Sequence, residues 1–522
     1  MRKKNLSRRD FLGKSAAGVT VLGIAPALLN SPWMFSGCKG PVSGDRAMLI
    51  PEDVLKKALE IVMSKNADFG DIYVETASFN GISSDDRKIN TSTTLEKGIG
   101  VRAVKDGKTF YAYTDSFDAQ EIYKTAQVVA DAAYVAPSSS PGVVIDLTRQ
   151  QNPISFPMIP DPLKIVVEDK IALVQSLTDR AWSADPKVNQ VSQLYREIIR
   201  DVTLATSSGK IITQTLGVTE FRASTYMKDE DGQIQNGSDG RAAYAGQEFY
   251  QGENSFESIV DKSVQRAKNL LEAVDSPRGV FPVVLGPGAP GVIFHESCGH
   301  GMEADLVFKG SNYKDQIGKQ TAAKGVTLID DGTIPQMPGS FAFDDEGTPS
   351  ERTVLITDGI QQNYLCDLIW AQKIDMKSTG SGRRQSFRYP PIPRMRNTFI
   401  DNGTVNPEDI IAETKRGIYV CNAGGGQVDP VTGNFMMGVP EGYLIENGKM
   451  TRPIKGATIS GMGIEAMKTI DMVGNDLAVL AGAGRCGKMQ SATVGFGMPT
   501  TRVLGILVGG NGPDWGEKKG GA

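Results

Sequence analysis

Both histidines of this 522-residue chain lie in one short stretch, His295-Glu296-Ser297-Cys298-Gly299-His300, which also holds a glutamate and a cysteine. Imidazole is the commonest side-chain metal ligand, and a neighbouring carboxylate can accept a proton from water that the metal activates. Two structural histidines that bind no metal are the alternative. The clustering favours a catalytic metal site.

The residues before this stretch indicate how the histidines are presented. Pro290 suits the first turn of a helix, so a short helix is expected to carry them. Successive residues of an ideal α-helix advance by about 100°, which leaves side chains five positions apart about 140° apart. A π-type turn or a local break can absorb the extra residue. We therefore predict an irregular helix around residues 295–300.

Two imidazoles do not complete a zinc site, because catalytic zinc usually takes three protein ligands and leaves a fourth position for water. The chain has no third histidine, so a thiolate or a carboxylate must supply the third ligand. The candidates are Cys298, Cys366, Cys421, Cys486 and any nearby Asp or Glu. Cys486 follows Arg485 and precedes Lys488 in a glycine-rich stretch, and nearby cations lower the pKa of a thiol. A buried, inert cysteine is the alternative for each candidate.

Length and composition limit the class of protein. A chain of 522 residues is longer than one core usually grows, so two or three packed units are expected. The net charge is -4 and no basic stripe is interleaved with aromatic residues, which argues against nucleic acid as a partner. Five cysteines are too few and too dispersed for a disulfide framework.

The first 45 residues differ from the rest. Ser7-Arg8-Arg9-Asp10-Phe11-Leu12 precedes a mild apolar run over residues 16–29 that glycines and a proline interrupt. This order resembles a twin-arginine export signal, with a basic disordered tail as the alternative. We expect residues 1–45 to be a signal and linker, and the mature protein to be exported and periplasmic or membrane-anchored.

Cys38 is a candidate site of membrane attachment. Phe35-Ser36-Gly37-Cys38 resembles a lipoprotein cleavage box, in which Cys38 would become the lipid-carrying first residue. Phe35 departs from the usual Leu. Ordinary signal cleavage nearby and an incidental linker cysteine are the alternatives.

Hydrophobic periodicity predicts an N-terminal α/β domain over residues 46–276, in two segments with a Pro/Ser-rich break near 137–142. Strands joined by short turns predict an antiparallel sheet and therefore an α+β fold. The expected helices are 51–62, 119–133, 167–181 and 258–273, and the expected strands are 71–76, 98–104, 109–113, 191–204, 211–226 and 242–250.

Residues 277–515 are predicted to form a β-rich C-terminal catalytic domain with long loops. The expected strands are 279–285, 353–357, 417–420, 443–445 and 501–507.

Four motifs carry a resemblance to a known family. They are His295-Glu296-x-x-x-His300-Gly301-x-Glu303, Asp344-Asp345-Glu346-Gly347, Gly424-Gly425-Gly426-Gln427-Val428-Asp429-Pro430 and Cys486-Gly487-Lys488. In this order, over residues 48–510, the chain resembles the TldD/PmbA family, specifically its TldD-type zinc metallopeptidase subunits. The resemblance implies one zinc ion per chain, held by His295, His300 and Cys486, with Glu296 as the catalytic base.

The resemblance also implies substrates and partners. Members of the family degrade unfolded or short peptides, which lie extended along a sheet edge and are held through main-chain hydrogen bonds. TldD-type chains pair with a related subunit, so a homodimer or a heterodimer with such a subunit is expected. The export signal departs from the family pattern, and so does Cys298, for which packing against the core is favoured over metal binding.

The remaining charged residues and the glycine-rich stretch are expected to have structural or surface roles. Asp344, Asp345 and Glu346 taken alone predict a solvated turn, to which the family adds a structural or substrate-binding role. Residues 423–427 predict a tight turn near the substrate path, since a P-loop ending is missing. The possible oxyanion donors are Arg394, Arg396, Arg485 and Lys488, although a solvated surface cation is the favoured interpretation of each.

Three functions compete: a zinc peptidase, an exported metal-containing scaffold or binding subunit without turnover, and a hydrolase of a non-peptide amide. Glu296 favours an enzyme over a scaffold, because an inert subunit does not need a base.

Overall fold

The computed structural model of the chain describes residues 48–134, 145–154 and 161–516. The expected export signal, Cys38 and the break near 137–142 lie outside these residues. Within them, no helix is both long enough and apolar enough to cross a membrane.

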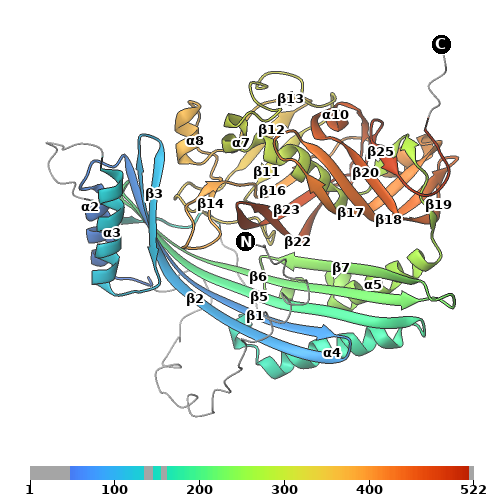
Figure 1. The fold of residues 1–522 in the computed structure, drawn as a ribbon, viewed down its shortest axis with the longest axis horizontal. Coiled ribbons are helices and arrows are strands. Elements are labelled where there is room, and N and C mark those ends of the chain that lie inside the picture. Colours follow the sequence, from blue (N-terminus) through green and yellow to red (C-terminus); the bar gives the residue numbers. More distant parts are fainter. Residues whose placement is uncertain (1–47, 135–144, 155–160, 517–522) are drawn as a thin grey trace, which may run out of the picture. The chain divides into compact units, whose positions relative to one another are not determined.

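The N-terminal half is built on one seven-stranded sheet (Figure 1). The strand order is β3-β2-β1-β5-β6-β4, with β7 also paired to β6, and every pair is antiparallel except β4–β6. The strands are β1 (Phe69–Asp85), β2 (Lys88–Lys105), β3 (Lys108–Thr114), β4 (Thr148–Arg149), β5 (Val188–Thr206), β6 (Lys210–Lys228) and β7 (Ile234–Ala243). The helices are α2 (Glu52–Met63), α3 (Ala119–Ala133), α4 (Val167–Ser183) and α5 (Phe256–Leu271).

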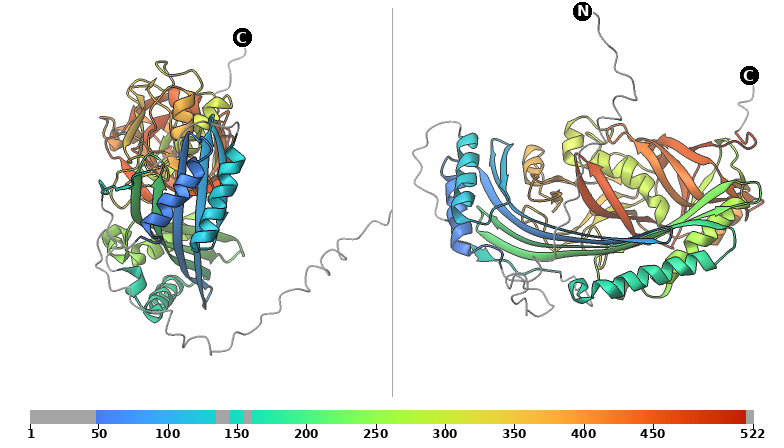
Figure 2. Two further views of the ribbon diagram at one scale, coloured as in Figure 1. Left: turned by 90° about the vertical axis from the view of Figure 1, so that its left-hand side faces the viewer. Right: turned by 60° about the horizontal axis from the view of Figure 1, so that its bottom comes forward.

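Side-chain alternation along the strands decides what each face of this sheet contacts. Ile72 and Val74 of β1 pack against α2 and α3, and Ile82 of the same strand lies in the core under α4 and α5. Tyr73 points to the opposite face, where it packs with Phe343 of the C-terminal half. The four helices therefore cover one face of the sheet, and the C-terminal half covers part of the other (Figures 1 and 2).

A ten-stranded sheet, a six-stranded sheet, a two-stranded pair and several short helices form the C-terminal half, which confirms the α+β fold class. A ten-stranded sheet contains β8 (Val274–Asp275), β9 (Gly279–Val280), β10 (Val283–Leu285), β17 (Arg416–Val428), β18 (Asn434–Glu446), β19 (Lys449–Lys455), β20 (Ala457–Met462), β21 (Ile470–Val473), β24 (Thr501–Val503) and β25 (Leu507–Gly509).

The second sheet of this half has six strands in the order β13-β12-β11-β16-β23-β22, so β22 is an end strand. Its members are β11 (Leu328–Asp331), β12 (Arg352–Thr357), β13 (Ile360–Gln361), β16 (Asn397–Ile400), β22 (Ala478–Lys488) and β23 (Gln490–Met498). A separate pair joins β14 (Gly382–Arg383) to β15 (Ile392–Pro393). The helices are α6 (Val292–Phe294), α7 (Ala304–Phe308), α8 (Leu368–Lys373), α9 (Pro407–Glu413) and α10 (Gly463–Lys468).

Several predicted strands are longer in the structure, such as 71–76 within Phe69–Asp85, and three others are misplaced or divided. The strand predicted over 242–250 is wrong, because β7 ends at Ala243 and the chain turns so that the Tyr250 ring stacks on Phe256 at 4.2 Å. The strand predicted over 279–285 is interrupted at Pro282, which has no N–H to donate. The strand predicted over 501–507 is likewise divided between β24 and β25.

A buried ion-pair network joins the two halves. Arg102 of β2 donates from Nε to Asp71 at 2.5 Å and from Nη1 to Glu346 at 2.6 Å. Arg384 donates to the other oxygen of Asp71 at 3.1 Å. All four side chains are fully buried or nearly so. Charges from both halves of the chain therefore neutralise one another inside the protein.

The predicted solvated turn at Asp344, Asp345 and Glu346 is wrong, because all three residues are buried. Asp344 accepts three backbone N–H groups, and Asp345 accepts the backbone N–H of Arg384. Glu346 accepts from Arg102 and from the backbone of Leu368. These carboxylates have the structural role that the family resemblance allowed.

Replacing Arg102 tests whether the network holds the halves together. Arg102→Met leaves two buried carboxylates without their shared partner and is expected to destabilise the protein by about 3–5 kcal/mol. The matched control is Arg180→Met, which breaks a half-exposed pair with Asp261 and is expected to cost no more than about 1 kcal/mol. Guanidinium-induced unfolding of both variants gives the comparison, and equal midpoints would contradict the assigned role.

Candidate metal centre

The histidines are carried by a π turn. After a 3-10 turn at Ala289–Gly291 and the short α6, the residues His295–Gly299 form a π turn. The backbone N–H of His300 donates to the carbonyl of His295, an i→i+5 bond that absorbs the extra residue. The irregular helix predicted from the spacing is confirmed.

Tight packing surrounds this turn. A Cβ at Gly299 would lie 2.1 Å from the Met395 sulfur, and a Cβ at Gly463 would lie 2.5 Å from the carbonyl oxygen of Ser297. The Ser297 hydroxyl donates back to the carbonyl of Ile293 at 2.6 Å. Because neighbouring segments approach this closely, the turn has little freedom to relax into a regular α-helix.

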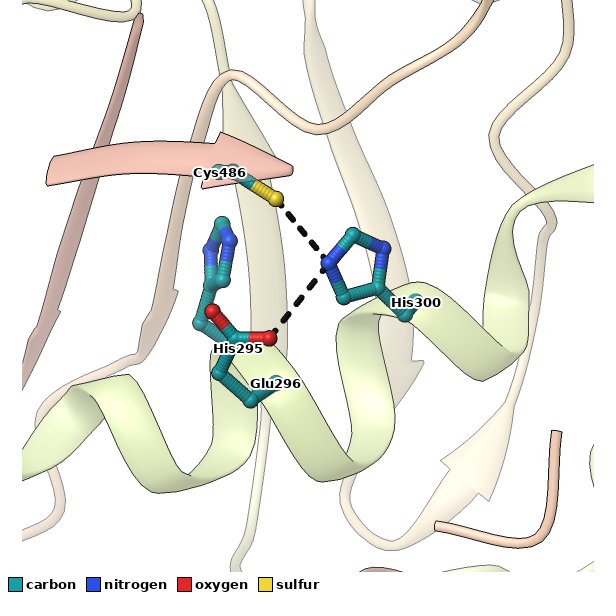
Figure 3. A group of neighbouring side chains, drawn as sticks. All are labelled: His295, Glu296, His300 and Cys486. Atoms are coloured by element: carbon teal, nitrogen blue, oxygen red, sulfur yellow. Dashed lines mark hydrogen bonds and ion pairs between the residues drawn. The ribbon is translucent and has the colours of Figure 1, made fainter. Parts of the chain in front are cut away.

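Four side chains converge at this point (Figure 3). One ligand atom from each of His295, Glu296, His300 and Cys486 lies within 4.8 Å of the others. The Cys486 sulfur lies 2.9 Å from His300 Nε2, and a Glu296 oxygen lies 3.5 Å from the same nitrogen. The two histidines and the cysteine are buried, whereas the Glu296 side chain is 30% exposed. Solvent can therefore reach the carboxylate of Glu296.

The donor set fits a divalent cation. Both ring nitrogens of His295 are buried and have no hydrogen-bond partner among the described residues. Leaving a buried polar group unpaired costs about 1–3 kcal/mol. Imidazole nitrogens and thiolate sulfurs are preferred ligands of zinc, and a catalytic zinc site usually has three protein ligands. A cation at the centre of the cluster would satisfy His295.

The other described cysteines lie outside the cluster. Cys298 is fully buried in the main hydrophobic core, and burial raises the pKa of its thiol to about 11. Burial also raises the pKa values of Cys366 and Cys421 to about 12. These three thiols are poor sources of thiolate, so Cys486 is the cysteine that the structure offers as a ligand.

Cys486 differs because of its imidazole neighbours. Burial acts to raise its pKa, but the charge of His300 and the nearby His295 outweigh burial and lower the pKa to about 5. The prediction that the neighbouring cations Arg485 and Lys488 lower this pKa is wrong, because the two histidines are the groups that lower it. Lys488 is bonded to Glu303 and Asp305 instead.

Glu303 supports His300 from behind, a role that the sequence analysis did not assign. Its carboxylate lies 2.7 Å from His300 Nδ1, which leaves Nε2 turned toward Cys486. Burial opposes the charged form of Glu303, but Lys488 and His300 hold its pKa well below the usual range. The pKa of His300 is raised to about 10, because the charges of Glu303 and Cys486 outweigh burial, which acts to lower it. The i,i+3 spacing from His300 was the available signal.

Two of the suggested oxyanion donors are structural residues. Arg394 is buried, donates to the backbone carbonyls of Cys486 and Gln490, and thereby fixes the turn that follows the cysteine. Arg396 is fully buried and bonded to Asp330. The interpretation of Arg394, Arg396 and Lys488 as solvated surface cations is wrong.

Comparison with known proteins places the chain. Three family models match it: PmbA/TldA metallopeptidase domain 1 over residues 70–133, the central domain over 160–271 and the C-terminal domain over 278–510. The chain belongs to the TldD/PmbA metallopeptidase family. The matched ranges include His295, His300 and Cys486 within the C-terminal domain.

Relatives of TldD/PmbA type match most of the chain. It is 35% identical to a metalloprotease TldD homolog of Haemophilus influenzae over 477 residues, 89% of this chain and 98% of the relative. It is 25% identical to a zinc metalloprotease TldD homolog of Saccharolobus solfataricus over 479 residues, 87% of this chain and 99% of the relative. The crystal structure of TldE from Thermococcus kodakarensis has the same fold, with a TM-score of 0.67, 21% identity and coverage of 87% and 99%.

Removing the charge behind His300 tests the support that Glu303 provides. Glu303→Gln keeps the shape of the side chain but no longer polarises the imidazole, so metal affinity is expected to fall about 10- to 100-fold. A competitive chelator titration with zinc measures this. Glu465→Gln, which breaks an exposed pair with Lys468, is the control and should bind zinc as the parent chain does. Equal affinities for the two variants would show that Glu303 does not support the site.

Proposed function

We propose that the chain is a zinc-dependent metallopeptidase that hydrolyses unfolded or short peptides. The observation that carries the proposal is the convergence of His295, His300 and Cys486 beside the exposed carboxylate of Glu296. Membership of a metallopeptidase family supports the reaction class, and the name of the Saccharolobus relative supports zinc. One ion per chain is proposed, because the described residues contain one such cluster.

The proposed roles follow from position and burial. His295, His300 and Cys486 hold the cation, and Glu303 and Lys488 fix the orientation of His300. When bound, a zinc ion supplies Lewis acidity that acidifies water and polarises a carbonyl. Glu296 accepts the proton of the attacking water and passes it to the leaving amine, which is general acid–base work of about 10²- to 10⁴-fold.

The wider setting of this activity is also part of the proposal. Export by the twin-arginine route, with or without a lipid on Cys38, would place the peptidase outside the cytoplasm. The proposal includes a dimer with a second copy or with a related subunit, and the fold shared with TldE of Thermococcus kodakarensis is its support. A scaffold without turnover is less well supported, because Glu296 is the exposed member of the cluster. A hydrolase of a non-peptide amide would need the same residues. Only assays with both kinds of substrate distinguish this alternative from a peptidase.

Glu296→Gln separates metal binding from catalysis. The amide cannot accept a proton, so peptide cleavage is expected to fall at least about 100-fold while the variant still holds about one zinc per chain. Metal analysis and digestion of a mixed peptide pool, read by mass spectrometry, measure the two properties. Cleavage at the parent rate would defeat the proposed mechanism, and loss of zinc would make Glu296 a ligand.

Cys486→Ser tests the third ligand. A serine hydroxyl does not ionise near neutral pH, so zinc binding is expected to weaken, and a chelator should remove the metal at lower concentration. Cys421→Ser is the matched control, because Cys421 lies outside the cluster and is only partly buried. Retention of zinc by both variants to the same degree would exclude Cys486 as a ligand.

A further inference from the structure

A second charged cluster lies across β22 from the metal centre. Arg485 and Cys486 are successive residues in a regular stretch of β22, so their side chains point to opposite faces of the strand. Cys486 points toward His300 (Figure 3), and Arg485 therefore points away from the metal. On that side β22 packs on β7 of the N-terminal sheet. The charged groups that act on Arg485 there are Arg196, Glu220 and Arg222.

The N-terminal sheet fixes the positions of these partners. Arg196 of β5 and Glu220 of β6 are directly opposite in register, and Arg222 follows on the same face of β6. Arg196 donates to one oxygen of Glu220 and Arg222 donates to the other. Arg485 makes no hydrogen bond or ion pair with any residue that the structure describes. One carboxylate thus serves two guanidinium groups while a third lies beside them.

Among the residues that the structure describes, this cluster holds three guanidinium groups and one carboxylate, that of Glu220. Arg196 Nε is buried and has no hydrogen-bond partner among the described residues. Like charges held this close repel each other, and a second anion would relieve the repulsion. A guanidinium is a planar fork that matches a carboxylate through paired N–H donors. The cluster is also accessible, because the Arg222 side chain is 50% exposed and that of Arg196 is 25% exposed.

We propose that Arg485, with Arg196 and Arg222, binds a carboxylate of the peptide substrate close to the bond that is cleaved. The inference rests on the proposed peptidase function and adds a substrate class to it. Adjacent Cα atoms are about 3.8 Å apart, and an extended peptide advances about 3.3 Å per residue. A carboxylate bound at Arg485 therefore belongs to a residue within a few positions of the metal. It is either an acidic side chain or the carboxyl terminus of the peptide.

Matched peptides test this inference. One peptide sequence is prepared with a free carboxyl terminus or a terminal amide, and with Glu or Gln a few positions from the cleaved bond. In the parent chain, kcat/KM should be higher for the carboxylate peptide than for its neutral partner in one of the two pairs. A difference between terminal acid and amide identifies the carboxyl terminus as the bound group, and a difference between Glu and Gln identifies the side chain. In Arg485→Gln the ratio of carboxylate to neutral kcat/KM should fall by about 10- to 100-fold, the range for a hydrogen bond to a charged group.

Further variants separate recognition from support of the fold. Arg222→Gln should lower the same ratio, whereas Glu220→Gln should raise it, because the competing carboxylate is removed. Arg452→Gln, an exposed residue of β19, is the control and should leave the ratio unchanged. Zinc content is measured for each variant, since Arg485 adjoins Cys486. If the cluster only packs β22 on β7, these substitutions would change kcat/KM for all four peptides by the same factor. The ratio of carboxylate to neutral kcat/KM would then stay the same.

Direct binding distinguishes failure of this inference from failure of the proposed function. If the parent chain cleaves no peptide, the proposed function fails, and calorimetric titration of Glu296→Gln with the same four peptides still tests the carboxylate site. The site is supported if Glu296→Gln binds a carboxylate peptide more tightly than its neutral partner, and if the double variant with Arg485→Gln loses this preference. Equal affinity for charged and neutral forms, or a ratio that Arg485→Gln does not change, overturns it.

Discussion

The hydrogen bond from the His300 N–H to the His295 carbonyl is the constraint on which the candidate metal centre depends. In a regular α-helix two residues five apart would diverge, and only one imidazole could face Cys486. The π turn brings both to one side, at the cost of poorer local geometry. Close contacts at Gly299 and Gly463 hold that geometry in place. Tertiary packing thus stabilises a turn that the local chain alone would not favour.

A chain of charges extends from the cluster into the protein. Glu303 contacts His300, Lys488 contacts Glu303, and Asp305 shares the same ammonium group. Each charge is buried and would be costly alone, but each has an opposite partner. The orientation of His300 is therefore fixed by buried residues behind it. The same balancing of buried charge recurs at Arg102, where it joins the two halves.

The sequence predicted what depends on local spacing. Apolar periodicity located α2 and α3 and the first strands, and the five-residue spacing of the histidines predicted the irregular turn. Local spacing does not predict which residues far apart in the sequence come into contact. Burial of Glu346 depends on Arg102, 244 residues away, and the thiolate character of Cys486 depends on His300, 186 residues away. Tyr250 was assigned to a strand because its packing on Phe256 does not show in an alternating pattern.

The register of β22 has a consequence for how the two charged regions coexist. Because adjacent residues of a strand face opposite ways, a slip by one position would remove the sulfur from the side of the histidines and place Arg485 or Gly487 there. Arg394 opposes this slip, because it donates hydrogen bonds to the carbonyls of Cys486 and Gln490 on the two strands of the hairpin. Accurate strand pairing near the carboxyl end is thus a precondition for the approach of Cys486 to the histidines, and a mispaired chain would lack the thiol of the cluster.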